Sequence, residues 1–260
     1  MKISIIGSGN LAWFTAQRWQ KAGHQIIEIC SRNPTNAQAL AAAVKAKACK
    51  HPESLSHEAD AFLFALPDAL LTTQVNLFRF KDRIIIHGAG TQPAMGMPAG
   101  NSGVIWPLFS LNKSDLPKTN GIPVFWEAHG PAAEIAIPEL AAALSGNCRE
   151  ADMGTRIQLH LSAVFVNNFV NHLMAVTQNR MATLGLPFND SLQPIITQTL
   201  RAAIIGKSAE SQTGPAIRHD MITMEKHLNL LAEHPEWQDI YQAISRSIQI
   251  FNTPKSPTEP

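Results

Sequence analysis

The stretch Lys2-Ile3-Ser4-Ile5-Ile6-Gly7-Ser8-Gly9-Asn10-Leu11-Ala12 decides the fold of this chain. Its first five residues are mostly β-branched and apolar, as in a buried strand. The pattern G-x-G-x-x-G/A follows, with Ala12 in its last position, and a helical pattern continues to Ala22. In this setting Gly7 permits a tight turn and Gly9 lets a pyrophosphate approach the backbone. We therefore expect a dinucleotide at the start of the helix; a glycine-rich turn without a ligand is the alternative. The residues expected to hold the dinucleotide are Gly7, Ser8, Gly9, Asn10 and Leu11.

The chain beyond this turn alternates between strand-like and helical patterns. Further strands are expected at residues 25–30, 61–66, 83–87, 104–108 and 122–127, and helices at 34–44, 68–78 and 132–144. Alternating strands and helices predict a parallel, doubly wound sheet. Residues 1–152 are therefore expected to form a Rossmann-type α/β domain that binds a dinucleotide. The Gly- and Pro-rich stretch 88–103 is expected to be a loop.

The second half of the chain lacks strand patterns. Helices are expected at residues 154–185, 192–205, 218–233 and 237–251. Residues 153–252 are therefore expected to form an all-α C-terminal domain for substrate binding or dimerisation. The Pro-rich polar end, residues 253–260, is expected to be disordered.

The residues that end the second strand indicate which dinucleotide binds. An NAD site usually has an acidic residue there, which binds the ribose 2′-hydroxyl. This chain has Ser31, Arg32 and Asn33 instead, while Glu28 comes about three residues too early. Because arginine pairs with phosphate in a bidentate manner, we expect NADP(H); an ordinary exposed arginine is the alternative. Leu66, Pro67 and Asp68, after the next strong strand, are also expected at the cofactor, although Asp68 could only cap the following helix.

Composition excludes several classes of protein. The chain has 260 residues, 21 Lys and Arg against 20 Asp and Glu, and a net charge of +1. Such a balance gives no basic surface for nucleic acid or anionic membranes. No uninterrupted apolar run approaches the ~20 residues of a membrane span. The three widely spaced cysteines are typical of a cytoplasmic protein, and the histidines show no metal-binding spacing.

Several short motifs recur in the order seen in one known family. They are Leu66-Pro67-Asp68, His87 with Gly90, Trp106-Pro107-Leu108, Glu127, and the run from Gln212 to Asp220 with its Thr-Gly-Pro-x-x-Arg-x-Asp pattern. With the glycine turn they resemble the Rossmann-like and DUF2520 domain-containing family over nearly the whole chain. The resemblance implies an NADP-dependent oxidoreductase that is distantly similar to pyrroline-5-carboxylate reductase and 6-phosphogluconate dehydrogenase-like proteins. The family commonly has glycine where this chain has His219.

Candidate catalytic residues come from three places. Asn168 and Asn171 lie on one face of an otherwise apolar helical pattern, with His160 and Asn167 on the same face. Their spacing resembles substrate-binding asparagines of related reductases, but Ala163 replaces the lysine often found one turn earlier. Arg218 is expected to bind a substrate carboxylate that Asp220 orients. His87, at a strand end, is a candidate proton donor.

Each of these residues also has a purely structural interpretation. The asparagines could form a hydrogen-bond network between helices, and the Arg218–Asp220 turn could be a helix cap with an ion pair. His87 could bind a loop carbonyl.

The sequence thus leads to two main functional hypotheses, beside a third, a non-redox enzyme on a Rossmann scaffold. The first is an NADP(H)-dependent oxidoreductase that transfers a hydride to or from a small carbonyl, imine or hydroxy compound bound between the two domains, possibly an anionic one. The second is a non-catalytic NADP(H) sensor or a dimeric binding protein. Phe165, Phe169 and Leu173 form an apolar stripe. Because the helical half has so many apolar positions, we expect a homodimer in either case.

Overall fold

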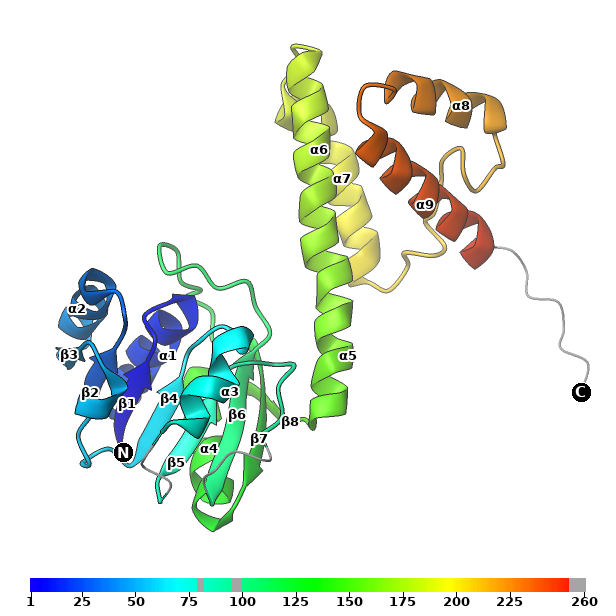
Figure 1. The fold of residues 1–260 in the computed structure, drawn as a ribbon. Helices are drawn as coiled ribbons and strands as arrows, with labels where there is room; N and C mark the ends of the chain where they lie inside the picture. The colour runs from blue at the N-terminus through cyan, green and yellow to red at the C-terminus, as the bar shows by residue number, and fades with distance from the viewer. Residues whose placement is uncertain (79–81, 95–99, 253–260) are drawn as a thin grey trace, which may run out of the picture. The chain divides into compact units, whose positions relative to one another are not determined.

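The computed structural model describes residues 1–78, 82–94 and 100–252. The chain forms two compact units, Met1–Asn167 and Asn168–Pro260. The first contains all eight strands assigned in the described ranges (Figure 1). The predicted domain boundary, between residues 152 and 153, falls where the last strand has ended and a helix begins. The tail predicted to be disordered lies outside the described residues.

One eight-stranded sheet organises the first unit, in the order β3-β2-β1-β4-β5-β6-β7-β8. All neighbouring strands are parallel except β6 and β7, which are antiparallel. The strands are β1 (Lys2–Ile6), β2 (Gln25–Cys30), β3 (Lys47–Cys49), β4 (Ala61–Phe64), β5 (Ile84–His87), β6 (Asn101–Pro107), β7 (Pro123–His129) and β8 (Asn147–Glu150). The first six follow the Rossmann order, in which the strands are added in one direction from β1 to β3 and in the other direction from β4 to β6. The predicted fold class is confirmed.

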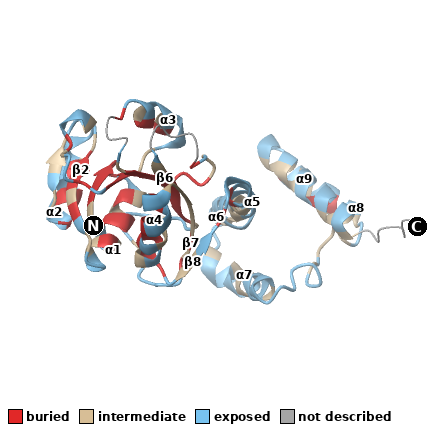
Figure 2. Ribbon diagram, turned by 90° about the horizontal axis from the view of Figure 1, so that it is seen from below, coloured by how far each residue is buried: buried red, intermediate tan, exposed pale blue. Residues whose placement is uncertain are grey.

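Helices cover both faces of this sheet. They are α1 (Asn10–Lys21), α2 (Pro34–Ala43), α3 (Asp68–Asn76) and α4 (Pro131–Leu144), with a short 3₁₀ turn at Pro52–Ser54. Alternate residues of β4 point to opposite faces, as strand geometry requires. Leu63 packs with residues of α1, α2 and α4, whereas Phe62 and Phe64 pack with residues of α3. Figure 2 shows the buried residues concentrated here.

The second half contains helices only within the described ranges. They are α5 (Met153–Ala163), a π-helical segment (Val164–Phe169), α6 (Val170–Thr183), α7 (Phe188–Ile204), α8 (Met221–Leu230) and α9 (Pro235–Asn252). Together α5, the π segment and α6 form one helix of 31 residues, as predicted. By length and composition alone this helix could span a membrane, with a mean hydropathy of 1.2 over its most apolar window. The sequence of this helix contains no long uninterrupted apolar run, because Asn and His interrupt the apolar pattern.

Several predictions of local structure were wrong. Strand β6 begins at Asn101, inside the stretch 88–103 that was predicted to be a loop. Strands β3 and β8 were missed because they are short, and β8 has the polar sequence Asn-Cys-Arg-Glu. Helix α7 begins four residues earlier than predicted, directly after Pro187. Helix α8 begins at Met221 and not at residue 218, because a turn occupies the preceding residues.

Candidate functional site

The glycine turn between β1 and α1 has the geometry that its sequence predicts. Gly7 has φ of +122°, and a Cβ there would lie 2.2 Å from the carbonyl oxygen of Ala65. Glycine is therefore required for both conformation and space. Gly9, directly before α1, has no atom within 4 Å of its Cβ position. The space beside Gly9 is open to a ligand, and the free amide groups of the first turn of α1 lie next to it.

A cavity of about 450 Å³ lies along the carboxyl ends of β1, β2 and β4. This is the edge at which doubly wound sheets bind ligands. The predicted residues that line it are Gly7, Ser8, Gly9, Asn10, Ser31, Arg32, Asn33, Leu66 and Pro67. A hydrogen bond of 2.8 Å from the Ser8 hydroxyl to the Ser31 hydroxyl joins the glycine turn to the end of β2.

The charges around this cavity favour a phosphate. Exposed Arg32 lies on its wall with two lysines that the sequence reasoning did not select, Lys50 after β3 and Lys113. Lys50 was overlooked because β3 was not recognised. Glu28 is 4% exposed and accepts hydrogen bonds from the Ser4 hydroxyl and the Ser56 amide, at 3.2 and 2.9 Å. It therefore belongs to the core and is not an acidic ligand for a ribose 2′-hydroxyl. The residues present fit NADP.

Two predicted cofactor residues do not line the cavity. The Leu11 side chain fills the space that a Cβ at Gly88 would need. Asp68 accepts a hydrogen bond of 2.8 Å from the Thr91 hydroxyl. Both side chains therefore contact the loop that follows β5, and their contact with a cofactor stays a prediction.

His87, at the end of β5, is 1% exposed and bonded through both ring nitrogens. The Ala89 amide donates to Nδ1 at 3.2 Å, so Nε2 carries the proton and donates to the Pro93 carbonyl at 3.1 Å. Burial lowers the pKa of His87 to about 4, against the opposing effect of the Pro93 hydrogen bond. The side chain is thus a neutral anchor of residues 88–93. His87 thus binds a loop carbonyl, which was the structural alternative to its predicted role. This arrangement does not support a role for His87 as proton donor.

Arg156 on α5 secures the same loop from the other side. Its side chain is fully buried and donates to the carbonyls of Gly90 and Gln92, at 3.1 and 3.0 Å. It also forms an ion pair with Glu127 on β7. Burial acts to raise the pKa of Glu127, but hydrogen bonds from Arg156 and His129 outweigh this effect and lower it. The first part of the predicted loop, residues 88–94, is therefore tied down. Residues 95–99 lie outside the described ranges, and residues 101–103, also predicted to be loop, belong to β6.

The polar face predicted on the long helix overlaps its π-helical segment. Asn167 and Asn168 lie inside that segment, which is a type of helix irregularity that occurs frequently at functional sites. The Asn167 amide donates to the Ser110 hydroxyl at 2.9 Å, and the His160 ring lies 6.1 Å from that of Trp106. Asn168, Asn171 and His172 are exposed. A catalytic role for Asn168 and Asn171 therefore stays a prediction.

The turn before α8 holds the other candidates. Asp220 caps α8, since its carboxylate accepts hydrogen bonds from the Thr223 amide and hydroxyl, at 3.1 and 2.7 Å. These bonds lower the pKa of Asp220. Arg218 is exposed. His219 has φ of +53°, the left-handed region that favours the glycine common in the resembling family. The cap predicted as a structural alternative for Asp220 is confirmed.

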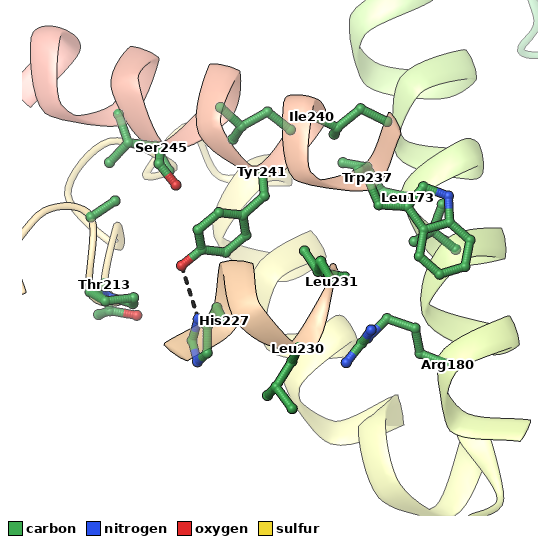
Figure 3. Close-up of a pocket in the computed structure, with 15 residues that line it drawn as sticks. Leu173, Arg180, Thr213, His227, Leu230, Leu231, Trp237, Ile240, Tyr241 and Ser245 are labelled. Atoms are coloured by element: carbon green, nitrogen blue, oxygen red, sulfur yellow. Dashed lines mark hydrogen bonds between the residues drawn. The ribbon is translucent and has the colours of Figure 1, made fainter. Parts of the chain in front are cut away.

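A second cavity, of about 480 Å³, lies within the helical unit among α6, α8 and α9 (Figure 3). Apolar residues dominate its walls. Its polar groups include Arg180 and a hydrogen-bonded pair, His227 and Tyr241, whose Nδ1 and hydroxyl oxygen are 2.9 Å apart. Sequence reasoning did not identify this cavity, because residues from three separate helices form it.

A Rossmann sheet with a glycine turn and a cationic cavity at its strand ends defines a dinucleotide-binding protein. Residues 2–88 match the family described as "NADP oxidoreductase coenzyme F420-dependent", and residues 122–248 match "Domain of unknown function (DUF2520)". A solved Bacteroides fragilis protein, itself proposed to be an NADP oxidoreductase, is 32% identical; the alignment covers 95% of this chain and 97% of that one, with a TM-score of 0.84. The chain therefore belongs to the NADP oxidoreductases that carry a DUF2520 domain, and its cofactor is NADP.

Two more distant solved structures share the fold. Pyrroline-5-carboxylate reductase from Streptococcus pyogenes is 15% identical, with 96% of this chain and 98% of that one covered and a TM-score of 0.59. A reductive aminase from Aspergillus terreus, in complex with NADPH and ethyl-5-oxohexanoate, is 15% identical, with coverage of 95% and 94% and a TM-score of 0.66. No curated protein matches the chain.

Proposed function

We propose that this protein transfers a hydride between NADP(H) and a small carbonyl, imine or hydroxy compound. The observation that carries the proposal is the cavity at the strand ends, where Arg32 and Lys50 flank the open side of the glycine turn. The names of the two distant relatives, pyrroline-5-carboxylate reductase and reductive aminase, favour imines within this group of substrates.

The reaction needs the protein to orient two molecules and to manage one proton. The nicotinamide supplies or accepts the hydride when the cofactor is bound. In the reducing direction the substrate carbon receives the hydride, and its nitrogen or oxygen takes a proton. The tied loop 88–94 keeps the end of β5 in a fixed conformation beside the cofactor edge. His87 does not release this proton in our proposal, because its Nε2 hydrogen is held by the Pro93 carbonyl.

The substrate groups are proposed to come from the helical unit. Asn168 and Asn171 would orient the reacting group, and exposed Arg218 would bind a carboxylate of an anionic substrate. Asp220 contributes by capping α8 and thereby fixing the turn that carries Arg218. We further propose that the protein is a homodimer and acts in the cytoplasm, as its composition led us to expect.

Isotope transfer tests this function directly. NADPH with deuterium at C4 is incubated with the protein and a panel of ketones, 2-oxo acids and cyclic imines, with and without ammonia. We expect deuterium on the substrate carbon of at least one imine or carbonyl product, as measured by mass spectrometry. Tight NADPH binding without transfer to any compound would support the sensor hypothesis instead. The Arg218→Ala variant should raise KM for an anionic substrate and leave NADPH affinity unchanged.

A further inference from the structure

Two of the three cysteines lie side by side at the edge of the cavity that fits NADP. Cys30 ends β2 and Cys49 ends β3, and the two residues are direct partners in the parallel pairing of these strands. Both side chains pack with the apolar cluster on the α3 face of the sheet, so they point to the same side. Cys30 also lines the cavity itself. A pair of adjacent thiols therefore borders the candidate cofactor site.

The two thiols differ in exposure and in acidity. Cys30 is 1% exposed, whereas Cys49 is half-buried. The Cys30 thiol donates a hydrogen bond to the Cys49 sulfur, and this bond raises the pKa of Cys30, together with burial. The same bond lowers the pKa of Cys49, against the effect of burial, and a hydrogen bond with Ser54 lowers it further. Because the thiolate is the reactive form of cysteine, Cys49 is the nucleophile of the pair.

The spacing of the strands suits a bond between the two sulfurs. Residues paired across neighbouring strands lie about 4.8 Å apart, within the Cα separation of about 4.4–6.8 Å found in disulfides. The Cβ atoms of a disulfide are closer, at about 3.8 Å. Formation of the bond therefore draws the ends of β2 and β3 together by about 1 Å.

Movement of these strand ends reaches the cationic wall of the cavity. Arg32 follows Cys30 by two residues and Lys50 follows Cys49 directly, and both cations line the cavity. The Ser31 amide donates to the Cys49 carbonyl at 3.1 Å, so the two backbones stay joined beyond the cysteines. A charge-assisted contact with a phosphate depends on the exact position of the cation. Drawing the strand ends together therefore displaces both cations from a phosphate that they hold in the reduced protein.

We propose that Cys30 and Cys49 form a reversible disulfide on reaction with a peroxide, and that this modification weakens NADP(H) binding. The proposal goes beyond the proposed function, since it needs cofactor binding but not hydride transfer. Disulfides of cytosolic proteins are usually transient and redox-sensing, which agrees with a bond that a small thiol can reduce again.

The reaction consumes one hydrogen peroxide and forms two water molecules. The Cys49 thiolate attacks one peroxide oxygen, the O–O bond breaks, and the hydroxide that leaves takes up a proton. Cys49 is then a sulfenic acid, oxidised by two electrons. The Cys30 sulfur attacks the sulfur of this group, the S–O bond breaks, and the leaving hydroxide takes the Cys30 proton. Two molecules of a small thiol reverse the bond by exchange and are oxidised to their own disulfide.

The third cysteine is an internal control. Cys148 lies on β8, at the opposite edge of the sheet from β3. Its thiol donates to the carbonyls of Ser145 and Ala141, at 2.9 and 3.0 Å. Burial raises the pKa of Cys148. We therefore expect Cys148 to stay reduced when the other two cysteines react.

Peptide mapping and calorimetry on the full chain test the proposal. The wild type is treated with hydrogen peroxide, freed of it by gel filtration, and alkylated without reduction. Mass spectrometry should find the peptides of Cys30 and Cys49 joined with the loss of two hydrogens, and Cys148 alkylated. The Kd for NADPH should rise at least about 10-fold, as expected when a charge-assisted contact is displaced. Dithiothreitol should restore the affinity, which oxidation of methionine would not allow.

Two variants complete the experiment. Cys49→Ser removes the nucleophile at a position outside the cavity lining, so it should bind NADPH as the untreated wild type does and keep this affinity in peroxide. Cys148→Ser should respond as the wild type does. Cys30 and Cys49 that remain thiols, sulfinic acid at Cys49 without a disulfide, or a disulfide that involves Cys148 would each overturn the proposal. So would a Cys30–Cys49 disulfide with unchanged NADPH affinity, or an equal loss of affinity in treated Cys49→Ser.

Discussion

Arg32 is the residue that selects the cofactor in our interpretation, because it offers a guanidinium where NAD-binding proteins have an acid. Arg32→Asp removes a charge-assisted hydrogen bond of about 1.5–3 kcal/mol, which corresponds to about 10- to 150-fold in affinity. We expect this loss for NADPH and a much smaller one for NADH in titration calorimetry. Lys50→Ala should act in the same direction. Lys118→Asp, which changes an exposed lysine outside the cavity lining, is the control. Equal losses for both cofactors would remove the 2′-phosphate assignment.

His87, which anchors the loop after β5, makes the stability of the protein depend on pH. Its pKa of about 4 in the folded protein lies below that of an unfolded histidine, so the unfolded chain binds the proton more tightly. Stability is therefore fully present above pH ~6.5 and is lost as the pH falls towards 4, by about 3 kcal/mol in total. Between pH 7 and 4, the free energy of unfolding of the His87→Gln variant should fall by about 3 kcal/mol less than that of the wild type. Urea unfolding at a series of pH values measures both. The same change at exposed His51 should not alter the wild-type slope; parallel slopes for all three proteins would contradict the assignment.

His219 adopts a backbone conformation that costs a non-glycine residue free energy. With φ of +53°, His219→Gly should raise the free energy of unfolding by about 0.5–1 kcal/mol. His172→Gly, at an exposed position inside α6, should instead lower it, because glycine weakens a helix interior. Thermal unfolding of the two variants and the wild type shows whether each substitution raises or lowers the free energy of unfolding. If both variants were destabilised, the turn before α8 would not have the conformation described.

At the scale of elements, the β1–α1 turn contains two glycines with different roles. We expect Gly7 to be needed for stability and Gly9 for cofactor binding. Gly9→Val places its side chain in open space, so we expect an unchanged melting temperature but no NADPH binding. Gly7→Ala forces a Cβ against the Ala65 carbonyl at a positive φ, so it should lower stability by at least about 1 kcal/mol. Calorimetry and thermal unfolding of the pair give the two readouts. NADPH binding by folded Gly9→Val protein would refute the position of the pyrophosphate.

The elements also show which features of the fold and the site can be predicted from the sequence. The glycine turn, the strands β1 and β2, and the residues after β2 were predictable, because period-two patterns and glycine spacing are local signals. The clamp formed by Arg156 and Glu127 was not, since its partners are 29 residues apart and an isolated arginine on a helix looks like a surface charge. Lys50 depended on the unrecognised strand β3. The π segment has no sequence signature, and its asparagines were selected only as polar residues in an apolar helical pattern.

At the scale of the whole molecule, the place where the sheet unit ends has energetic consequences. A fragment of residues 1–152 follows the predicted boundary but lacks α5, so Glu127 loses Arg156 and the carbonyls of Gly90 and Gln92 lose their donors. A fragment of residues 1–167 keeps all of these contacts. Removing one partner of a buried ion pair costs about 3–5 kcal/mol, and Glu127 retains 16% side-chain exposure, which places the expected loss at the lower end. Urea unfolding followed by circular dichroism should therefore find the shorter fragment less stable by about 3 kcal/mol. NADPH affinity should fall with it, because the loop after β5 is no longer held. Equal stability of the two fragments would mean that the sheet unit is complete at residue 152 and that α5 belongs functionally to the helical half.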